Sequence, residues 1–157
     1  MEEIFTQQEW ELLNATPRIV VNFIGKVDER LDKKEIDAFV KFCNAKRKFK
    51  SDLFKAILPD NPDEYLSEPY DPTKNADIFR ELDATLDLKF DPVDGKLFKH
   101  HLIALGVHIA NASGKLFQHT ISEEEDEALY KLGRMIDVDA AQLFRTTLVD
   151  DILKNVE

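Results

Sequence analysis

The chain has 157 residues, of which 43% are hydrophobic, 11 are Phe and only 5 are Gly; this composition predicts one folded domain with a sizeable core and excludes an intrinsically disordered chain. The formal net charge is −10 and is uneven, because residues 1–58 carry +1 and residues 59–157 carry −11. Such an acidic surface repels nucleic acids and anionic membranes, which argues against a nucleic-acid partner; it favours cations or basic partners, or serves solubility alone.

Two helix starts open the chain. Thr6 followed by Glu9 fits a capping box, in which a hydroxyl and a carboxylate satisfy free backbone amides at a helix N-terminus. A short helix to about Leu13 should follow. Pro17 fits the first turn of a helix, so we predict that a second helix begins there. Its apolar residues recur at helical spacing: Ile19, Val20, Phe23, Ile24 and Val27.

The next helix has a stronger start signal. Asp32 stands at the N-cap position and Glu35 at the third helical position, which again fits a capping box. Ser51 can cap a last short helix of this half, which Pro59 ends. The stripe predicted to be buried in the helix after Asp32 consists of Ile36, Phe39, Val40 and Cys43.

Residues 59–75 read as a Pro-rich linker. They contain four of the 6 prolines of the chain, at positions 59, 62, 69 and 72. Proline favours extended or turn conformations in its neighbourhood and interrupts helices, so no long helix is expected here.

The second half repeats the helical theme. One helix is expected over about 76–88, a turn at Asp94-Gly95, and a longer helix in which apolar residues from Phe98 to Ala112 step by four and three. Ser122 and Asp139 then fit the N-caps of two further helices.

An internal repeat accounts for this similarity between the halves. Shifted by 90 positions, residues 31–58 lie on 121–148 without a gap, and Glu35 falls on Glu125. We therefore predict an all-α fold: a compact helical bundle of about seven to eight helices from two pseudo-symmetric repeats. The chain should form a single domain over 1–157, with repeat one at about 6–58 and repeat two at about 76–155.

The repeated unit reads IGKVDERLDKKEIDAF in the first copy and IANASGKLFQHTISEEEDEAL in the second. It resembles the tellurite-resistance TerB family, whose unit joins a small-residue helix to an acidic-capped helix through an Asp-Gly turn. In this sequence Glu29 and Ser113 depart from that turn. The resemblance implies a cytoplasmic protein of tellurite or other stress response. It also implies protein partners, membrane-associated ones among them, and a divalent cation such as calcium bound by acidic residues at the turns.

The candidate cation ligands are Asp28, Asp32, Glu35 and Glu125. A hard cation takes several oxygen ligands at once, and equivalent glutamates of two facing repeats could supply them. The alternative is that each glutamate only caps its own helix. The EF-hand pattern is excluded, because counting back from Gly95 or Gly114 places an apolar residue at the first ligand position.

Two other functions stay open. In the first, the chain is a metalloenzyme that uses inward carboxylates and histidines of the bundle, with His101 and His108 seven residues apart on one face. In the second, it is a metal-free protein-interaction module, either monomeric or a homodimer. The sequence contains no GxSxG, P-loop or GxGxxG motif, and Cys43 lies on an apolar stripe typical of a core residue. These observations favour a non-enzymatic protein.

The single cysteine excludes an intrachain disulfide and any CxxC motif. No apolar run approaches the roughly 20 residues that span a bilayer, and the acidic start of the chain does not resemble a signal peptide. We therefore expect a cytoplasmic location without direct membrane insertion.

Overall fold

The computed structural model describes residues 2–25, 31–68, 71–113, 123–136 and 147–156. These residues form eight α-helices and no strand, which confirms the predicted all-α class. None of the helices in these ranges is both long and apolar enough to cross a membrane. The twofold relation between two repeats stays a prediction.

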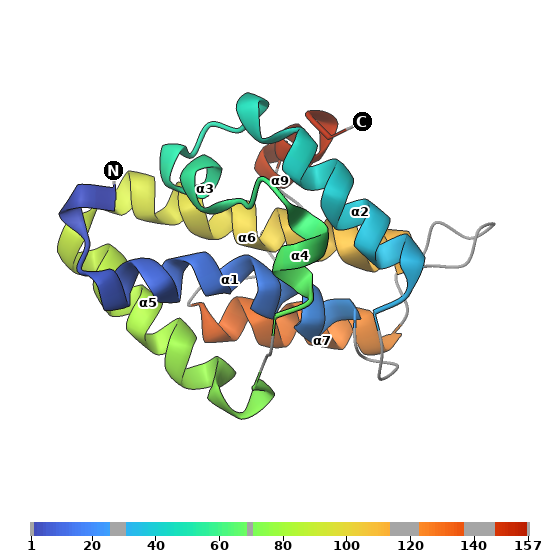
Figure 1. Cartoon of the computed structure of the whole chain (residues 1–157), viewed down its shortest axis with the longest axis horizontal. Coiled ribbons are helices and arrows are strands. Elements are labelled where there is room, and N and C mark those ends of the chain that lie inside the picture. The colour runs from blue at the N-terminus through green and yellow to red at the C-terminus, as the bar shows by residue number, and fades with distance from the viewer. Residues whose placement is uncertain (1, 26–30, 69–70, 114–122, 137–146, 157) are drawn as a thin grey trace.

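Two long helices run side by side through the middle of the bundle, α1 (Gln7–Gly25) and α6 (Pro92–Ser113) (Figure 1). Helix α2 (Lys33–Asn44) packs on α6, and α7 (Glu123–Met135) packs on both central helices. Helix α5 (Asn75–Lys89) lies against α1, and α9 (Thr147–Lys154) against α6.

Short elements fill the connections. The 3-10 helices are η1 (Glu2–Ile4), η3 (Lys46–Lys48) and η4 (Pro72–Lys74), and the short α-helices are α3 (Asp52–Ile57) and α4 (Pro62–Leu66). The segment expected to be a linker, 59–75, therefore contains α4 and η4. Pro62 and Pro72 each stand at the start of one of them, where a missing amide hydrogen costs nothing.

The core is rich in aromatic rings. Six phenylalanines are fully buried: Phe39, Phe42, Phe49, Phe54, Phe79 and Phe98. Gly106 lets α6 approach its neighbours closely, because a Cβ there would lie 2.9 Å from Leu129 Cδ2 of α7 and 3.5 Å from Ile24 Cγ1 of α1.

Three local predictions were wrong. Helix α1 does not stop before Pro17 but continues through it. Asp94 and Gly95 lie in the first turn of α6 rather than in a separate turn, since Asp91 accepts a hydrogen bond from the Asp94 amide and starts the helix. On α2 the buried stripe consists of Glu35, Ala38, Phe39, Phe42 and Cys43, whereas Ile36 and Val40 are only half-buried.

Candidate functional site

Of the four predicted cation ligands, Asp32 and Glu35 have side chains that the structure describes. Asp32 Oδ1 accepts a hydrogen bond from the Glu35 amide at 2.9 Å, and Glu35 Oε1 accepts one from the Asp32 amide at 2.9 Å. This is the capping box that the sequence predicts. Asp28 lies outside the described residues, and Glu125 lies in α7 but its side chain is also outside them.

Glu35 is buried, with only 2% of its surface exposed. Its carboxylate packs against the C-terminal end of α1, because a Cβ on Gly25 would lie 2.6 Å from Glu35 Oε2. Glu35 therefore joins the start of α2 to the end of α1. Within the described ranges no three His, Cys, Asp or Glu side chains gather in a way that could hold a metal ion.

Two histidines of α6, His101 and His108, serve the packing of the bundle. His101 is fully buried between Phe49 and Phe54, with ring centroids at 5.4 and 5.2 Å. Its Nδ1 lies 2.8 Å from the Leu97 carbonyl oxygen, so Nδ1 carries the hydrogen. Burial lowers the pKa of His101 to about 4. The ring is therefore neutral near pH 7.

His108 contacts a different helix. Its Nε2 lies 3.0 Å from the Ala38 carbonyl oxygen of α2, and burial lowers its pKa as well. The ring of His108 packs on Phe42 at 5.6 Å between centroids. His101 and His108 thus reach separate aromatic neighbours, and among the described residues they do not converge with a carboxylate on one point.

Cys43 is a core residue, as its apolar stripe indicates. It is 3% exposed, and burial raises the pKa of its thiol to about 12. A thiol that stays protonated near neutral pH is a poor nucleophile.

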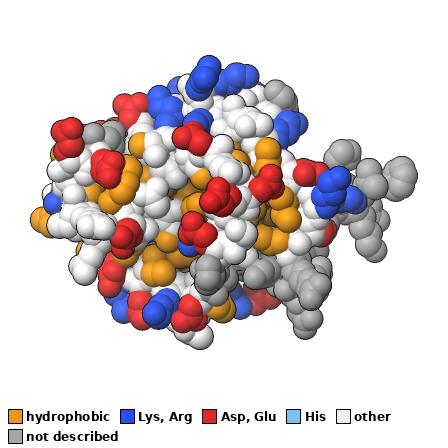
Figure 2. All heavy atoms as spheres, viewed as in Figure 1, with side chains coloured by type: hydrophobic (Ala, Val, Ile, Leu, Met, Phe, Trp, Pro, Cys, Tyr) orange, Lys and Arg blue, Asp and Glu red, His pale blue; other side chains and the backbone are white. Residues whose placement is uncertain are grey.

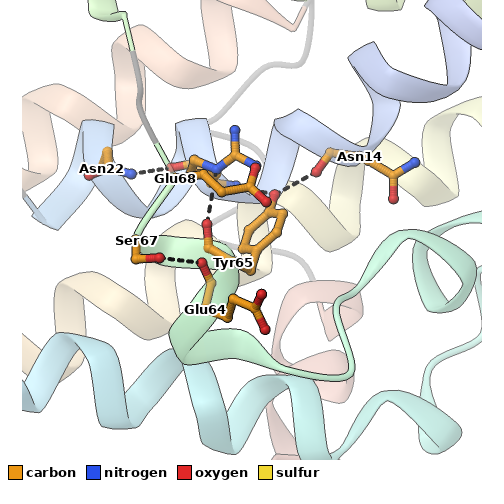
Figure 3. A network of polar contacts seen from close by, with 7 residues as sticks. Asn14, Asn22, Glu64, Tyr65, Ser67 and Glu68 are labelled. Carbon is orange, nitrogen blue, oxygen red and sulfur yellow. Dashed lines mark hydrogen bonds and ion pairs between the residues drawn. The ribbon is translucent and has the colours of Figure 1, made fainter.

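A network between α1 and α4 explains why α1 continues through Pro17. Pro17 lacks an amide hydrogen, and the Leu13 carbonyl that it would have bonded accepts from Thr16 Oγ1 at 2.7 Å instead. One position further on, the hydroxyl of Tyr65 enters the helix. It accepts from the Arg18 amide at 2.8 Å and donates to the Asn14 carbonyl at 2.5 Å (Figure 3). A side chain of α4 thereby replaces a backbone bond of α1.

The Arg18 side chain completes this contact. Its guanidinium lies 4.5 Å from the centre of the Tyr65 ring, and it pairs with Glu68 at 2.5 Å. Burial raises the pKa of the Tyr65 hydroxyl, so the hydroxyl keeps the proton that it donates to Asn14. The network fixes the Pro-rich segment on the helical body, and its groups are used for structure rather than chemistry.

The surface is hollowed at the other end of α1, away from Glu35. A groove of about 500 Å³ runs between the start of α1 and the C-terminal half of α5. We call it the α1–α5 groove. Its walls are formed by Thr6, Gln8, Glu9 and Leu12 of the α1 side, and by Glu81, Ala84, Thr85 and Leu88 of α5.

Several contacts order the residues beside the α1–α5 groove. Thr6 and Glu9 form the predicted capping box, with Thr6 N to Glu9 Oε1 at 2.7 Å and Glu9 N to Thr6 Oγ1 at 3.1 Å. The bond from the Thr6 amide lowers the pKa of Glu9, which stays charged. Lys89 at the end of α5 pairs with Glu9 at 3.4 Å and donates to the Ile4 carbonyl at 2.9 Å. Phe5 stacks on Phe90 at 5.7 Å.

Exposed apolar side chains gather at this end of the molecule. Leu88 is 79% exposed, Val93 is 75% exposed and Ile4 is 45% exposed, and the contacts of Lys89 and Phe90 bring their segments together. A second hollow of about 620 Å³ adjoins the groove at Thr6 and is lined by Phe5, Trp10 and three more glutamates. At the left-hand end of the face in Figure 2, acidic side chains lie around hydrophobic ones, whereas basic side chains gather at the top edge, where η3 lies in Figure 1.

The sequence contains a signal for the α1–α5 groove outside the apolar stripe of α5. The core stripe of α5 includes Phe79, Leu82 and Leu86, and Leu88 lies about 200° around the helix from Leu86. An isolated leucine on the polar face of an amphipathic helix indicates a second contact surface. That α1 forms the opposite wall depends on tertiary packing, which the local pattern does not contain.

Two further polar features were not predicted. Lys99 of α6 forms an ion pair with Asp83 of α5, and the lysine is 8% exposed. A smaller cavity of about 210 Å³ lies between α6 and α9, lined by Lys50, Leu97, His101, Asp151, Ile152 and Asn155. The Lys99–Asp83 pair ties α5 to α6 and so supports the wall of the groove.

This sequence matches no protein-family model, and it has no significant similarity to a curated protein or to a solved structure.

Proposed function

We propose that this chain is a TerB-like protein of tellurite or other stress response that acts in the cytoplasm, without catalysis, by binding other proteins at the end that carries the α1–α5 groove. The observation that carries the binding role is the exposure of Leu88, at 79%, in the wall of the α1–α5 groove. A large apolar side chain exposed beside a groove and rimmed by polar residues is typical of an interaction site. The stress-response role is supported by the resemblance of the two repeat motifs.

Cation binding belongs to this proposal as a separate property. The capping hydrogen bonds of Asp32 and Glu35 each use one carboxylate oxygen. The side chains of Asp28 and Glu125 would have to complete the site. The protein-binding role does not depend on it, because the α1–α5 groove lies at the opposite end of α1 from Glu35.

Site-specific crosslinking tests the protein-binding role. A photoreactive amino acid placed at Leu88 should give adducts with particular cellular proteins after irradiation in cells. The same amino acid at Asp37, an exposed position of α2, is the matched control. A partner counts only if the purified partner binds the purified chain and if Leu88→Ser weakens that binding. Equal adduct patterns from positions 88 and 37 would refute the binding role.

Growth on tellurite tests the stress-response role. Cells without this chain should be more sensitive to tellurite, and the wild-type chain should restore growth. The Leu88→Ser chain should restore it only in part, provided that both chains accumulate equally. Full restoration by Leu88→Ser would separate the stress role from the groove.

A further inference from the structure

The walls of the α1–α5 groove have one sign of charge. Glu9 and Glu81 face it, and the adjoining hollow adds Glu2, Glu3 and Glu11. No Lys or Arg lines either hollow within the described residues. Lys89 pairs with Glu9 at 3.4 Å and neutralises one of these five charges. A bound segment would therefore meet a negative field, which attracts positive side chains and repels phosphate groups.

The shape of the α1–α5 groove is that of a seam between two helices. On α5 the groove residues Glu81, Ala84, Thr85 and Leu88 stand at positions i, i+3, i+4 and i+7, so they form one continuous stripe about 10 Å long. Leu12 faces them from α1. A stripe of this kind accommodates the apolar face of another helix, whose own anchors recur at the same spacing.

The basic 3-10 helix η3 of this chain does not supply the occupant, for two reasons of structure. In η3, Lys46 is already paired with Asp60 at 2.5 Å. None of the large exposed apolar side chains of the described part, which are Ile4, Leu88, Val93 and Tyr130, lies in η3. A segment that is basic but has no apolar face would leave the floor of the groove uncovered.

From this charge and shape, we propose that the α1–α5 groove binds a positively charged amphipathic helix of a partner protein. The apolar face of that helix covers Leu12, Ala84 and Leu88, and its Lys or Arg side chains contact Glu81. This inference rests on the proposed protein-binding function and names the class of partner. Burial of Leu88, which is largely exposed in this chain, supplies the main apolar contribution.

Selection from a peptide library tests the partner class. Random 16-residue peptides are displayed and selected on the whole chain, with removal of those that also bind Leu88→Ser. The enriched sequences should carry Lys or Arg together with apolar residues at i, i+3 or i+4, and i+7. Enrichment of acidic, neutral or Pro-rich extended sequences would overturn the proposal.

The best enriched peptide is then synthesised and its affinity measured by fluorescence anisotropy. Leu88→Ser and Glu81→Lys should each weaken binding about tenfold or more, and binding should weaken as salt rises. Tyr130→Ser, a 40% exposed apolar position of α7, and Asp37→Lys are the matched controls and should leave the affinity within about twofold. Equal losses in the control variants would overturn the assignment to the groove.

These outcomes separate the two levels of the proposal. If position 88 crosslinks to a confirmed partner but the library yields no basic helix, the partner class is wrong and the protein-binding function stands. If neither the crosslinking nor the library gives the expected result, both the protein-binding function and the partner class are refuted. A second copy of this chain is the other possible occupant of the groove, and sedimentation of the chain alone tests it. Concentration-dependent self-association that Leu88→Ser abolishes would assign the groove to a second copy and overturn the proposal.

Discussion

Replacing Tyr65 with Phe should destabilise the fold by about 1–3 kcal/mol. The hydroxyl accepts from the Arg18 amide at 2.8 Å and donates to the Asn14 carbonyl at 2.5 Å. Phe keeps the ring, which stacks on Phe39 at 5.8 Å, but leaves both backbone groups of α1 without this partner. In a chain of this size each kcal/mol lowers the unfolding temperature by about 2–4 °C.

The decisive measurement is a double-mutant cycle with Pro17→Ala. In that variant residue 17 regains an amide hydrogen that can bond the Leu13 carbonyl, and α1 can close so that Arg18 bonds Asn14 directly. The free-energy cost of Tyr65→Phe should therefore be smaller in the Pro17→Ala background, by about 1 kcal/mol. Urea unfolding, followed by circular dichroism and by the fluorescence of Trp10, gives the four stabilities.

Two results would refute this reasoning. A Tyr65→Phe cost below about 0.5 kcal/mol would mean that water replaces the hydroxyl without loss, as at exposed positions. An equal cost in both backgrounds would mean that the bridge by Tyr65 has no link to the backbone gap at Pro17.

Three further predictions concern other parts of the molecule. Burial lowers the pKa of His101 from 6.5 to about 4, so between these pH values only the unfolded chain binds this proton. The contribution of His101 to stability should therefore be complete above about pH 6.5 and should be lost toward pH 4, by an amount on the order of 3 kcal/mol. His101→Leu should remove this part of the pH dependence, as measured by urea unfolding. Gly106→Ala should destabilise the fold by about 1 kcal/mol, because its Cβ would lie 2.9 Å from a buried leucine of α7. Gly95→Ala is the control: its Cβ would have ordinary contacts, and it should stabilise α6 by about 0.5–1 kcal/mol. Equal changes in the unfolding temperature of the two variants would contradict the close approach at Gly106. If the turn carboxylates bind Ca²⁺, calcium should raise the unfolding temperature of the wild type but not of a Glu35→Gln/Glu125→Gln variant, in which glutamine can still cap each helix; stabilisation of both proteins would place the cation elsewhere.

Local signals in the sequence predicted the helices well wherever the determining contacts are local. The capping box of Asp32 and Glu35 spans one turn, and the structure forms it as expected. Ser51 likewise caps α3 through the Phe54 amide at 3.2 Å. In both cases the cap and its partner lie three residues apart, so the pattern contains the whole interaction.

The continuity of α1 through Pro17 lies beyond such patterns. Proline normally ends or kinks a helix because of the missing amide and the clash with the preceding turn. The hydroxyl that bridges the Arg18 amide and the Asn14 carbonyl, next to Pro17, comes from Tyr65, 47 residues after Arg18. Only the tertiary packing of α4 on α1 and α2 brings it there.

The role of Glu35 also depends on contacts that the local sequence pattern does not contain. The sequence predicts that Glu35 is either a capping or a cation-binding carboxylate, because both roles need an acidic residue at this position. Its burial at 2% and its contact with Gly25 of α1 give it a third role, that of a buried polar link between two helices. Neither hydropathy nor charge patterning predicts a buried carboxylate, because both place ionised residues on the surface.

The two halves of α1 are held by different partners, and this makes binding and stability separable. Its C-terminal half is fixed by Tyr65 at the Pro17 gap. Its N-terminal half, which forms one wall of the α1–α5 groove, is fixed by the Lys89–Glu9 pair and by the stacking of Phe5 on Phe90. A variant at Tyr65 therefore alters the energy of the fold without changing a wall of the groove, whereas Leu88→Ser changes the wall at a side chain that is 79% exposed and adds little to the core. Loss of peptide affinity in Leu88→Ser at unchanged stability, and the reverse in Tyr65→Phe, is the pattern expected if the groove is a binding surface rather than an unfilled part of the core.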